Sequence, residues 1–301
     1  MAAPNFDLNL VRVFVAIYQE KSLTRTGERL NLTQSAISHA LSRLRSALGD
    51  RLFERRGARM LPTAMARDVF PGLESGLRRM EAVLADGGRF DPAVSRRIFR
   101  LGMNDYSTSI LLPRLMARLR REAPGLRLRI RQTTLEERQA FLMDGTVELL
   151  TGCDQDLGPG VARDRLFMDR DVVVVPEGHP ALGPSFGRKE REETPMISLS
   201  MTSGGDPLRG LALTGDGRVI LAVEQELAIP GLALASGCAA RMSERLALAL
   251  PGDSRVRIVR GVWPEPAFEV YLYRRENAEE DAGVAWLRER ILEEGAALDR
   301  L

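Results

Sequence analysis

The chain has 301 residues, of which 44% are hydrophobic and 28% charged, a composition typical of a globular protein with two or three domains. No apolar run reaches the roughly 18 residues that a membrane-spanning helix requires, and the N-terminal stretch lacks the pattern of a signal peptide, so we expect a cytoplasmic protein without membrane contact. Cys153 and Cys238 are the two cysteines and offer no metal-ligand spacing, so we expect no metal and no cofactor.

Positive charge is concentrated at the N-terminal end. Residues 1–62 contain ten Arg or Lys against five acidic residues, a net charge of +5, whereas the whole chain carries +2 and the remainder therefore −3. Such an asymmetry is the electrostatic pattern of a nucleic-acid-binding module. A solvated basic face has the same composition, so charge alone leaves both interpretations open.

Three helices are predicted within the first fifty residues. Apolar residues recur at helical spacing over residues 8–20, and Ser22 is a suitable N-cap for a short second helix that ends near Leu30. Gly27 within this second helix indicates a close helix contact, because glycine costs stability there. A third helix is predicted from an N-cap at Thr33 to about Leu48, with Gly49 after its last turn.

The third helix has two chemically different sides. Ile37, Leu41, Leu44 and Leu48 step by four, three and four residues and form one apolar stripe. The side chains off this stripe are small, polar or basic: Gln34, Ser35, Ser38, His39, Ser42, Arg43 and Arg45. A helix that only packed would not need this polar set on its first turns, so we expect the polar side to bind a partner.

A basic wing and a long helix follow. Residues 50–63 predict two short strands around 55–59, with Gly57 in the turn. From Thr63 to about Ala85 a long helix is predicted whose apolar stripe, outside any core, suits pairing in a dimer. Pro71 followed by Gly72 argues for a kink or a later start of this helix. Residues 86–92 are the clearest linker.

The remaining two-thirds alternate between strands and helices. We predict strands at 96–104, 126–133 and 147–152, separated by helices at 109–124 and 136–144, and hence a parallel sheet with crossover helices. Residues 171–176 are apolar throughout, as expected of a strand covered on both faces. The α/β pattern continues through 229–237 and 243–250, and a strand at 268–275 and a helix at 281–294 end the chain.

Four segments in this order resemble the LysR-type transcriptional regulators: "FVAIYQEKSLTRTGERLNLTQSAISHALSRLRSALGDRLFERR", "ILLPRLMARLRREAPGLRLRI", "VVVVPEGHPAL" and "LAIPGLALASGCAARMSERLA". The resemblance runs almost end to end. The wing, "LFERRGARMLPTAMA", is most similar to the branch that controls aromatic-compound and symbiosis pathways.

The resemblance implies an N-terminal all-α winged helix-turn-helix DNA-binding domain in residues 1–62 and a dimerising linker helix with its linker in 63–92. It implies a C-terminal α/β effector-binding domain in 93–301, of the two-lobed periplasmic-binding-protein type. Lobe one would be 93–165 plus 269–301, and lobe two 166–268. Members form homodimers or homotetramers on double-stranded promoter DNA, act with RNA polymerase, and bind a small molecule between the lobes.

The polar side of the third helix then faces the major groove, where base edges carry a full donor and acceptor code. Gln34 can pair in bidentate fashion with adenine, and the arginines further along the helix suit phosphates. His39 could instead act as a pH switch, but its place on this face favours a contact role. Family members often have Pro where Ser35 stands and Arg near His39, which alters the expected target sequence. The residues expected to contact DNA are Gln34, Ser35, Ser38, His39, Arg43 and Arg45 on the helix and Arg55, Arg56 and Arg59 on the wing.

The resemblance also places effector-binding residues. The turn that begins with Asn104 opens a helix, and helix N-termini hold carboxylates well, so an aromatic or other organic acid is the expected ligand. Asp105 would oppose an anion if it faced the ligand, and simple N-capping by Asn104 and Ser107 is the alternative interpretation. The residues expected to orient the ligand are Asn104, Tyr106, Thr133 and Thr134 on lobe one and Thr202 and Ser203 on lobe two.

Two other functions would require different features of the sequence. A redox-sensing regulator would use Cys153 and Cys238, which would need to be close in space. An enzyme with a DNA-binding arm finds little support, because His179 has no neighbouring nucleophile and the Gly-rich segments at 202–210 and 214–218 lack the Lys-Ser/Thr of a phosphate-binding loop. We therefore expect a ligand-controlled transcriptional regulator and not an enzyme.

Overall fold

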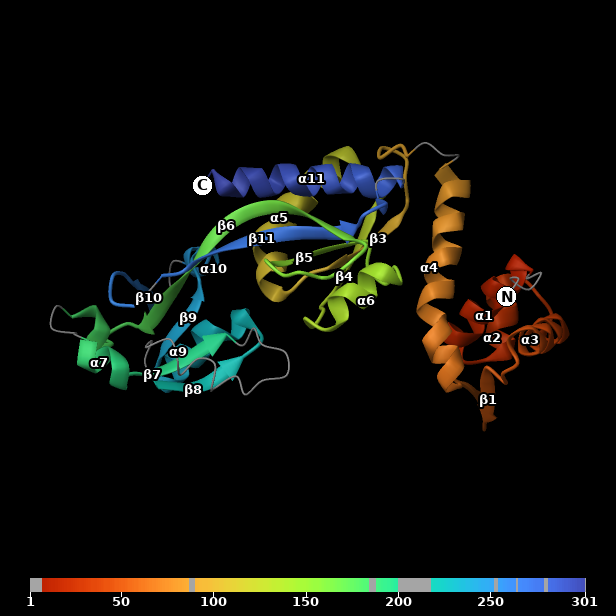
Figure 1. The fold of residues 1–301 in the computed structure, drawn as a ribbon, viewed down its shortest axis with the longest axis horizontal. Coiled ribbons are helices and arrows are strands. Elements are labelled where there is room, and N and C mark those ends of the chain that lie inside the picture. Colours follow the sequence, from red (N-terminus) through yellow and green to blue (C-terminus); the bar gives the residue numbers. More distant parts are fainter. Residues whose placement is uncertain are drawn as a thin grey trace. The chain divides into compact units, whose positions relative to one another are not determined.

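The computed structural model describes residues 7–86, 90–183, 188–199, 218–251, 254–263, 265–278 and 281–300 (Figure 1). The chain divides into two compact units, one of residues 1–89 and 144–146 and one of residues 90–143 and 147–301. Each unit is described by itself.

The first unit begins with the three predicted helices, which are confirmed. Each starts at a side chain that caps the helix: the Asp7 carboxylate accepts from the Asn9 N–H, Ser22 Oγ from Arg25, and Thr33 Oγ1 from Ala36. Gly49 ends the third helix in the left-handed conformation, as predicted. The three helices are α1 (Leu8–Glu20), α2 (Leu23–Leu30) and α3 (Gln34–Leu48).

One hydrophobic core joins these helices. Phe14 and Ile17 of α1 are fully buried, and Ile37 and Leu44 of α3 pack against them in the same cluster. Gly27 of α2 makes a close contact as predicted, but with the backbone of the α2–α3 turn and not with a helix: a Cβ there would lie 2.6 Å from the carbonyl oxygen of Leu32. The α2–α3 turn can therefore approach α2 this closely only because position 27 has no side chain.

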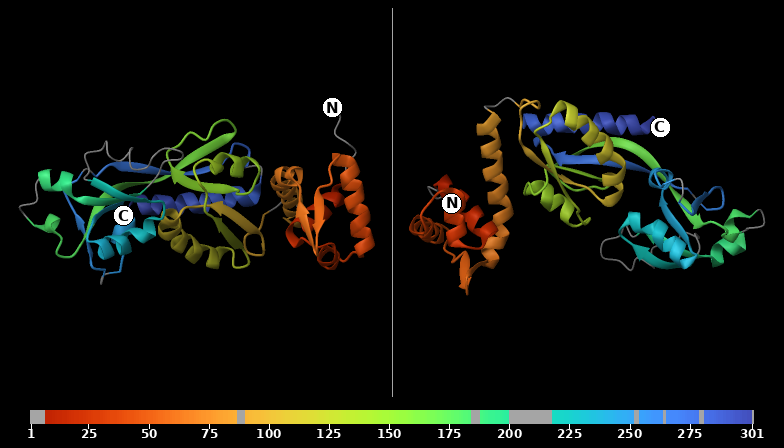
Figure 2. Two further views of the ribbon diagram at one scale, coloured as in Figure 1. Left: turned by 90° about the horizontal axis from the view of Figure 1, so that it is seen from below. Right: turned by 180° about the vertical axis from the view of Figure 1, so that it is seen from behind.

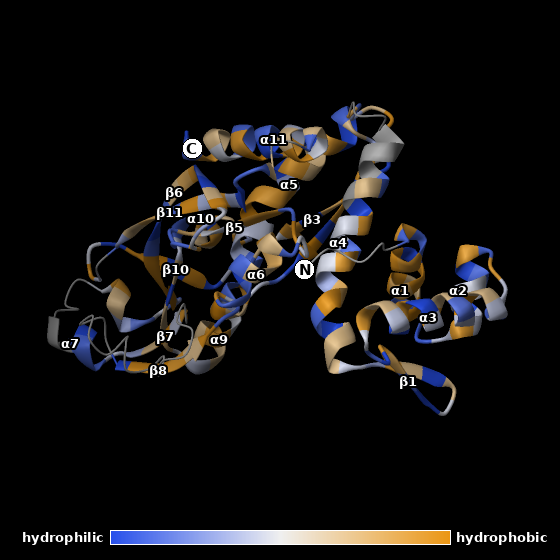
Figure 3. Ribbon diagram, turned by 45° about the vertical axis from the view of Figure 1, so that its right-hand side comes forward, coloured by the Kyte–Doolittle hydropathy of each residue, from blue (hydrophilic) through white to orange (hydrophobic). Residues whose placement is uncertain are grey.

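The wing is also confirmed. Strands β1 (Phe53–Arg56) and β2 (Arg59–Pro62) pair antiparallel around a turn in which Gly57 has φ +61°. Figure 3 shows hydrophilic colour near the turn and hydrophobic colour on α1. The Asp50 carboxylate anchors the base of the wing by accepting from the Leu52 N–H at 2.5 Å and the Thr63 hydroxyl at 2.8 Å, and these bonds lower the pKa of Asp50.

Helix α4 (Ala64–Asp86) contains Pro71, so of the two alternatives expected there, a kink or a later start, the later start is wrong. The expectation that its stripe lies outside any core is also wrong for the first half of the helix. Val69, Leu73 and Leu77 pack against the core of the first unit, whereas Met80 is 37% exposed. The side chain of Leu84, the last member of the stripe, lies outside the described residues.

The second unit is built on one sheet with the strand order β4-β3-β5-β11-β6-β9-β7-β8, and β10 pairs with β6. Figure 2 shows the ribbon from two further sides. The predicted parallel pairing holds for β3 with β4 and β5, and for β7 with β8 and β9. It fails at the centre, where β11 and β6 run antiparallel to their neighbours. The strands are β3 (Ile98–Gly102), β4 (Arg127–Arg131), β5 (Leu149–Cys153), β6 (Val161–Pro176), β7 (Pro195–Leu199), β8 (Arg218–Val223), β9 (Ala239–Ser243), β10 (Val256–Val259) and β11 (Ala267–Arg275).

Strand β6 connects the two halves of this sheet. Its residues 161–170 pair with β11, and from Asp171 onwards it pairs with β9 and β10. We call β3, β4, β5, β11 and the first part of β6 the first lobe, and β7 to β10 with the rest of β6 the second lobe. The strand passes between the lobes at residues 169–171, and β11 begins beside this point at Ala267.

Helices complete both lobes. In the first lobe α5 starts four residues earlier than predicted, because Asn104 caps its N-terminus and the helix begins at Asp105. Helix α6 packs with Leu150 and Tyr273 in a separate cluster of the first lobe. The helical segments of this unit are α5 (Asp105–Glu122), α6 (Glu137–Met143), η1 (Pro180–Leu182), α7 (Arg188–Glu193), η2 (Glu226–Ala228), α9 (Ile229–Ser236), α10 (Glu244–Leu248) and α11 (Ala282–Asp299).

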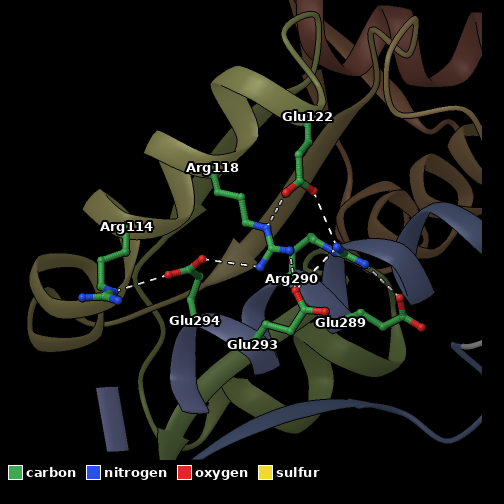
Figure 4. Close-up of polar contacts among 7 residues, drawn as sticks. All are labelled: Arg114, Arg118, Glu122, Glu289, Arg290, Glu293 and Glu294. Atoms are coloured by element: carbon green, nitrogen blue, oxygen red, sulfur yellow. Dashed lines mark hydrogen bonds and ion pairs between the residues drawn. The ribbon is translucent and has the colours of Figure 1, made fainter. Parts of the chain in front are cut away.

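An ionic network fastens α5 to α11. Arg118 pairs with Glu122 on its own helix at 2.6 Å and with Glu293 and Glu294 on α11, while Arg290 reaches back to Glu122 (Figure 4). Arg118 is 17% exposed, so its charge is screened less than that of a surface arginine. The network fixes the position of α5, the helix whose N-terminus carries two of the predicted ligand-binding residues.

Candidate DNA-binding surface and ligand-binding edge

The polar side of α3 is presented to solvent. Gln34, Ser35, Ser38, His39, Arg43 and Arg45 are all exposed. On the other side of the same helix Ile37, Leu41 and Leu44 are at most 3% exposed. The core therefore holds α3 by its apolar stripe and leaves the first turns accessible, which is the geometry that a helix in a major groove requires.

The side chains at the start of α3 differ in how they are engaged. The Ser35 hydroxyl lies 2.9 Å from that of the capping Thr33. Within the described part of the chain, Gln34, Ser38 and His39 make no side-chain hydrogen bond, so their donors and acceptors are available to a partner.

The two arginines of α3 make different contacts. Arg45 donates from Nε to the carbonyl of Arg51 at 2.8 Å and from Nη2 to that of Phe53 at 2.9 Å. It thereby ties α3 to the start of the wing, and only part of its guanidinium can face a phosphate. Arg43 pairs with Asp7 at 3.2 Å and keeps 62% of its side chain exposed. A phosphate could displace this weak surface pair.

The wing carries its three arginines outward. Arg55, Arg56 and Arg59 are exposed, and Arg56 and Arg59 lie opposite each other across the hairpin. Arg55 donates to the Gly57 carbonyl at 3.3 Å and so lies over the turn. The structure brings these residues onto the same compact unit as α3, within a short hairpin that directly follows it.

The ends of three parallel strands form a second candidate site. Strands β3, β4 and β5 end at Gly102, Arg131 and Cys153, and we call the residues that follow them the carboxyl edge. The chain leaves β3 toward β4 and then returns to the other side of β3, and ligands of open α/β sheets bind where the strand order reverses in this way.

The neutral polar residues predicted at this edge are largely engaged in capping. The Asn104 side chain accepts from the Ser107 N–H at 2.9 Å, which is the N-cap of α5. Thr134 donates from its backbone and its hydroxyl to Glu137, both at 3.1 Å, at the start of α6. Thr133 is half-buried beside it. Thr202 and Ser203, the residues predicted on the second lobe, lie outside the described residues.

Tyr106 lies at the junction between the lobes. It is 4% exposed, and its hydroxyl donates to Oδ2 of Asp169 at 2.6 Å. Asp169 lies on β6 where that strand passes between lobes, and it also accepts from the N–H of Arg245 at the start of α10 at 3.4 Å. Burial raises the pKa of both Tyr106 and Asp169. Sequence reasoning missed Asp169, although an acid three residues before the apolar run 172–175 is an available signal.

A second polar contact joins the lobes. The Asp105 carboxylate accepts from the N–H of Leu227 in η2 at 2.9 Å, so Asp105 caps an element of the second lobe. The neighbouring Glu226 is 2% exposed, and its carboxylate accepts from the backbone and the hydroxyl of Ser243. Burial raises the pKa of Glu226 to about 7, and the nearby charges of Asp105 and Asp171 act in the same direction.

The thiols do not have the environment of reactive cysteines. Burial raises the pKa of Cys153 to about 11, so this thiol stays protonated near neutral pH. Cys238 is 6% exposed and lies just before β9 in the second lobe, whereas Cys153 ends β5 in the first. Both are free thiols.

Two negative findings concern the described residues. Over these ranges there is no group of three or more His, Cys, Asp or Glu side chains placed to hold a metal ion. None of the helices in the described part of the chain combines the length and the apolar character needed to cross a bilayer.

The sequence matches two family models over most of its length. Residues 8–67 match the bacterial regulatory helix-turn-helix protein of the lysR family, and residues 93–296 match the LysR substrate binding domain. These two matches correspond to the helices with the wing and to the two-lobed unit described above.

Individual relatives cover nearly the whole chain. The HTH-type transcriptional activator NagR of Ralstonia sp. is 29% identical, with 96% of this chain and 97% of that protein aligned. Nodulation protein D 1 of Rhizobium meliloti (strain 1021) is 27% identical over 97% and 96%. Among solved structures, a probable transcriptional regulator from Pseudomonas aeruginosa superposes with a TM-score of 0.71 at 29% identity, covering 95% of this chain and 96% of that one. The nodulation protein agrees with the branch that the wing sequence indicated.

Proposed function

Because this chain belongs to the LysR-type family of transcriptional regulators, we propose that it reads a promoter sequence through α3 and the wing, and that a small molecule bound at the carboxyl edge controls it. The observation that carries the first half is the exposure of Gln34, Ser38 and His39 on a helix whose other side is buried. These three side chains contact base edges, and Ser35 joins them when its bond to Thr33 opens.

The arginines supply affinity and register. Arg43 on α3 and Arg55, Arg56 and Arg59 on the wing contact phosphates or the minor groove, where negative potential attracts arginine. Arg45 contributes mainly by holding the wing against α3, since two of its nitrogens bind carbonyls. The net charge of +5 over residues 1–62 makes binding strongly dependent on salt.

Control by a ligand follows from the junction between the lobes. Ligand binding can shift an equilibrium only when it differs in strength between two arrangements. The bonds from Tyr106 to Asp169 and from Leu227 to Asp105 both join elements of different lobes. A ligand near Asn104, Thr133 and Thr134 that moved α5 would lengthen or break them. The relative position of the lobes would then change at residues 169–171.

Assembly is part of the same proposal. The part of α4 that carries the exposed Met80 pairs with a second copy, and the paired helices place the two DNA-binding units on two half-sites. Dimers of this kind associate further into homotetramers, and contact with RNA polymerase converts occupancy into altered transcription.

Selection from a random DNA library tests the DNA-binding half of this proposal. The full-length protein should enrich a motif with two related half-sites, because a symmetric dimer reads a symmetric site. Gln34→Ala should relax one base position within each half-site, whereas Ser46→Ala, a change near the end of α3, should leave the motif unchanged. Failure to enrich any motif would contradict the proposal.

Footprinting on the selected motif tests ligand control. Benzoate and succinate serve as the aromatic and aliphatic acid probes, and we expect at least one of them to change the length of DNA protected or its bend. Identical footprints with and without both acids would contradict control by an organic acid.

A further inference from the structure

Arg138 is a buried arginine at the start of α6. The residue is 5% exposed, although arginine is almost never fully buried unless it is paired. Its guanidinium lies directly over Gly152 near the end of β5, where a Cβ would come within 2.8 Å of Nη1 and 3.1 Å of Cζ. The glycine therefore provides the space that the guanidinium occupies, and any other residue at 152 would force the guanidinium to move.

The contacts of this guanidinium are incomplete. Nη1 donates to the Gln155 side-chain oxygen at 3.1 Å. Nε is buried without a hydrogen-bond partner, and within the described part of the chain no carboxylate forms an ion pair with Arg138. Burial without a counter-charge lowers the pKa of this arginine. Leaving a buried charge unpaired is costly, so the fold gains nothing in stability from placing it there.

A largely buried and fully paired arginine of the first lobe, Arg97, shows the contrast. Arg97 is 12% exposed and binds both oxygens of Asp281 at 2.7 Å, with Glu148 at 2.8 Å as a second partner. That group serves the fold by joining the first turn of α11 to β3 and β5. Arg138 is more deeply buried than Arg97 and has no carboxylate partner among the described residues.

The position of Arg138 suggests which group supplies the missing partner of its guanidinium. It lies in the first turn of α6, four residues after Thr134, and over the last residues of β5, so it belongs to the carboxyl edge. Two acids near the ends of β3 and β4 have other partners, since Glu137 accepts from Thr134 and Asp105 accepts from the N–H of Leu227. A carboxylate matches the planar donor fork of a guanidinium better than any other small anion of metabolism except phosphate.

We propose that Arg138 binds the carboxylate of the controlling ligand, and that Gly152 is required to leave room for this guanidinium. The proposal deepens the function proposed above and rests on it, because it assumes a ligand at the carboxyl edge. Arg138 and not the α5 N-terminus then supplies the charge that selects an acid. Asp105 does not repel the ligand, because it is turned to the second lobe.

Binding of paired probes to the full-length protein tests this role. Benzoate and succinate are compared with benzamide and succinamide, which keep the shape of each acid and remove its charge. Isothermal titration and thermal shift should detect at least one acid and neither amide. Arg138→Gln should lower the affinity for that acid by about tenfold or more, the loss expected for a charge-assisted hydrogen bond. Arg129→Gln, the same change at an exposed arginine of β4, should leave the affinity within about twofold.

Two further variants separate binding from folding. Without ligand, Arg138→Gln should melt at the same temperature as the parent or higher, since it removes an unpaired buried charge. Gly152→Ala keeps the arginine and should also lower the affinity for the acid, because the new Cβ displaces the guanidinium. The inference is overturned if Arg138→Gln binds the acid as tightly as the parent, if the amides bind as well as the acids, or if neither acid binds the parent. A lower melting temperature of Arg138→Gln without ligand would also overturn it, by showing a structural role.

Failure of this proposal is distinguishable from failure of ligand control. The binding assay contains no DNA. Acid binding that depends on Arg138 but leaves the footprint unchanged would sustain the site and refute control. A footprint change that survives Arg138→Gln would sustain control and refute the site.

Discussion

Gly27→Ala tests whether the α2–α3 turn needs a residue without a side chain. In an open helical position this change stabilises a helix by up to about 1 kcal/mol. Here the new methyl would lie 2.6 Å from the Leu32 carbonyl oxygen, and the turn must move because that oxygen belongs to the backbone. The turn is further fixed by the bond from the Leu32 N–H to the Gly27 carbonyl at 2.9 Å.

The magnitude follows from these two opposing effects. Overpacking in a well-packed site costs about 1–3 kcal/mol, and subtracting the gain in helix propensity leaves a net loss of up to about 2 kcal/mol. A loss of that size corresponds to an increase of about 30-fold in local opening. Because Thr33 caps α3 directly after this turn, the displacement also reaches the first residues of the DNA-reading face.

Hydrogen exchange of the full-length protein measures the effect where it arises, since the two units need not unfold together. Amides of α2 and the start of α3 should exchange up to about 30-fold faster in Gly27→Ala. Gly231→Ala is the matched control, because a Cβ there meets nothing within 4 Å, and exchange in α9 should stay the same or slow. Unchanged or slower exchange around Gly27 would refute the reasoning.

Three further outcomes are expected. The free energy of unfolding of the second unit should fall as pH rises from about 5 to about 7, because Glu226 has an ordinary pKa of 4.5 and a folded pKa of about 7, so the folded state holds its proton over that interval and the unfolded state does not. Denaturant titrations of Glu226→Gln should lose this slope, and an unchanged slope would exclude Glu226 as its source. Arg97→Met should lower the free energy of unfolding of the second unit by about 3 kcal/mol, because it leaves two carboxylates without their partner. Arg114→Met removes an ion pair whose arginine is 41% exposed and should cost less than about 1 kcal/mol in the same titration. Equal losses would show that burial of the pair does not matter here. Arg56→Ala should reduce the salt dependence of DNA binding by about one counterion and lower the affinity for all DNA sequences alike. Fluorescence anisotropy over a range of salt concentrations measures both, and an unchanged slope would show that the wing does not contact phosphates.

Much of the first unit could be predicted because its signals are local. The caps at Ser22 and Thr33 act on N–H groups three residues away, and Gly49 ends α3 through its own backbone conformation. The apolar stripe of α3 is readable from spacing alone, because a helix repeats every 3.6 residues. The same locality explains the wing, where Gly57 marks the turn between two short strands.

The second unit was predictable in its elements but not in its pairing. Periodicity located β3, β4 and β5 and their crossover helices. It does not tell which strands that are far apart in the sequence pair with each other, or whether they pair parallel or antiparallel. Strand β11 pairs with residues 161–170 of β6 about a hundred positions earlier, and this antiparallel centre joins the two lobes. The first half of α4 was misjudged for the same reason, since its stripe looks alike whether it meets its own core or a second copy.

By itself, the sequence determined where the helices of the DNA-binding unit begin and end, which side of α3 faces outward, and where positive charge collects, because each depends on residues within a few positions of one another. Only the tertiary structure decided what the polar groups of the second unit contact. Tyr106 meets Asp169 from 63 positions away, Asp105 meets Leu227 from 122, and Arg138 is buried over a glycine of another element. Folding alone decides which side chains become buried and which partners they meet across such distances. These contacts distinguish Arg97, whose guanidinium is ion-paired within the fold, from Arg138, whose guanidinium we propose binds a ligand.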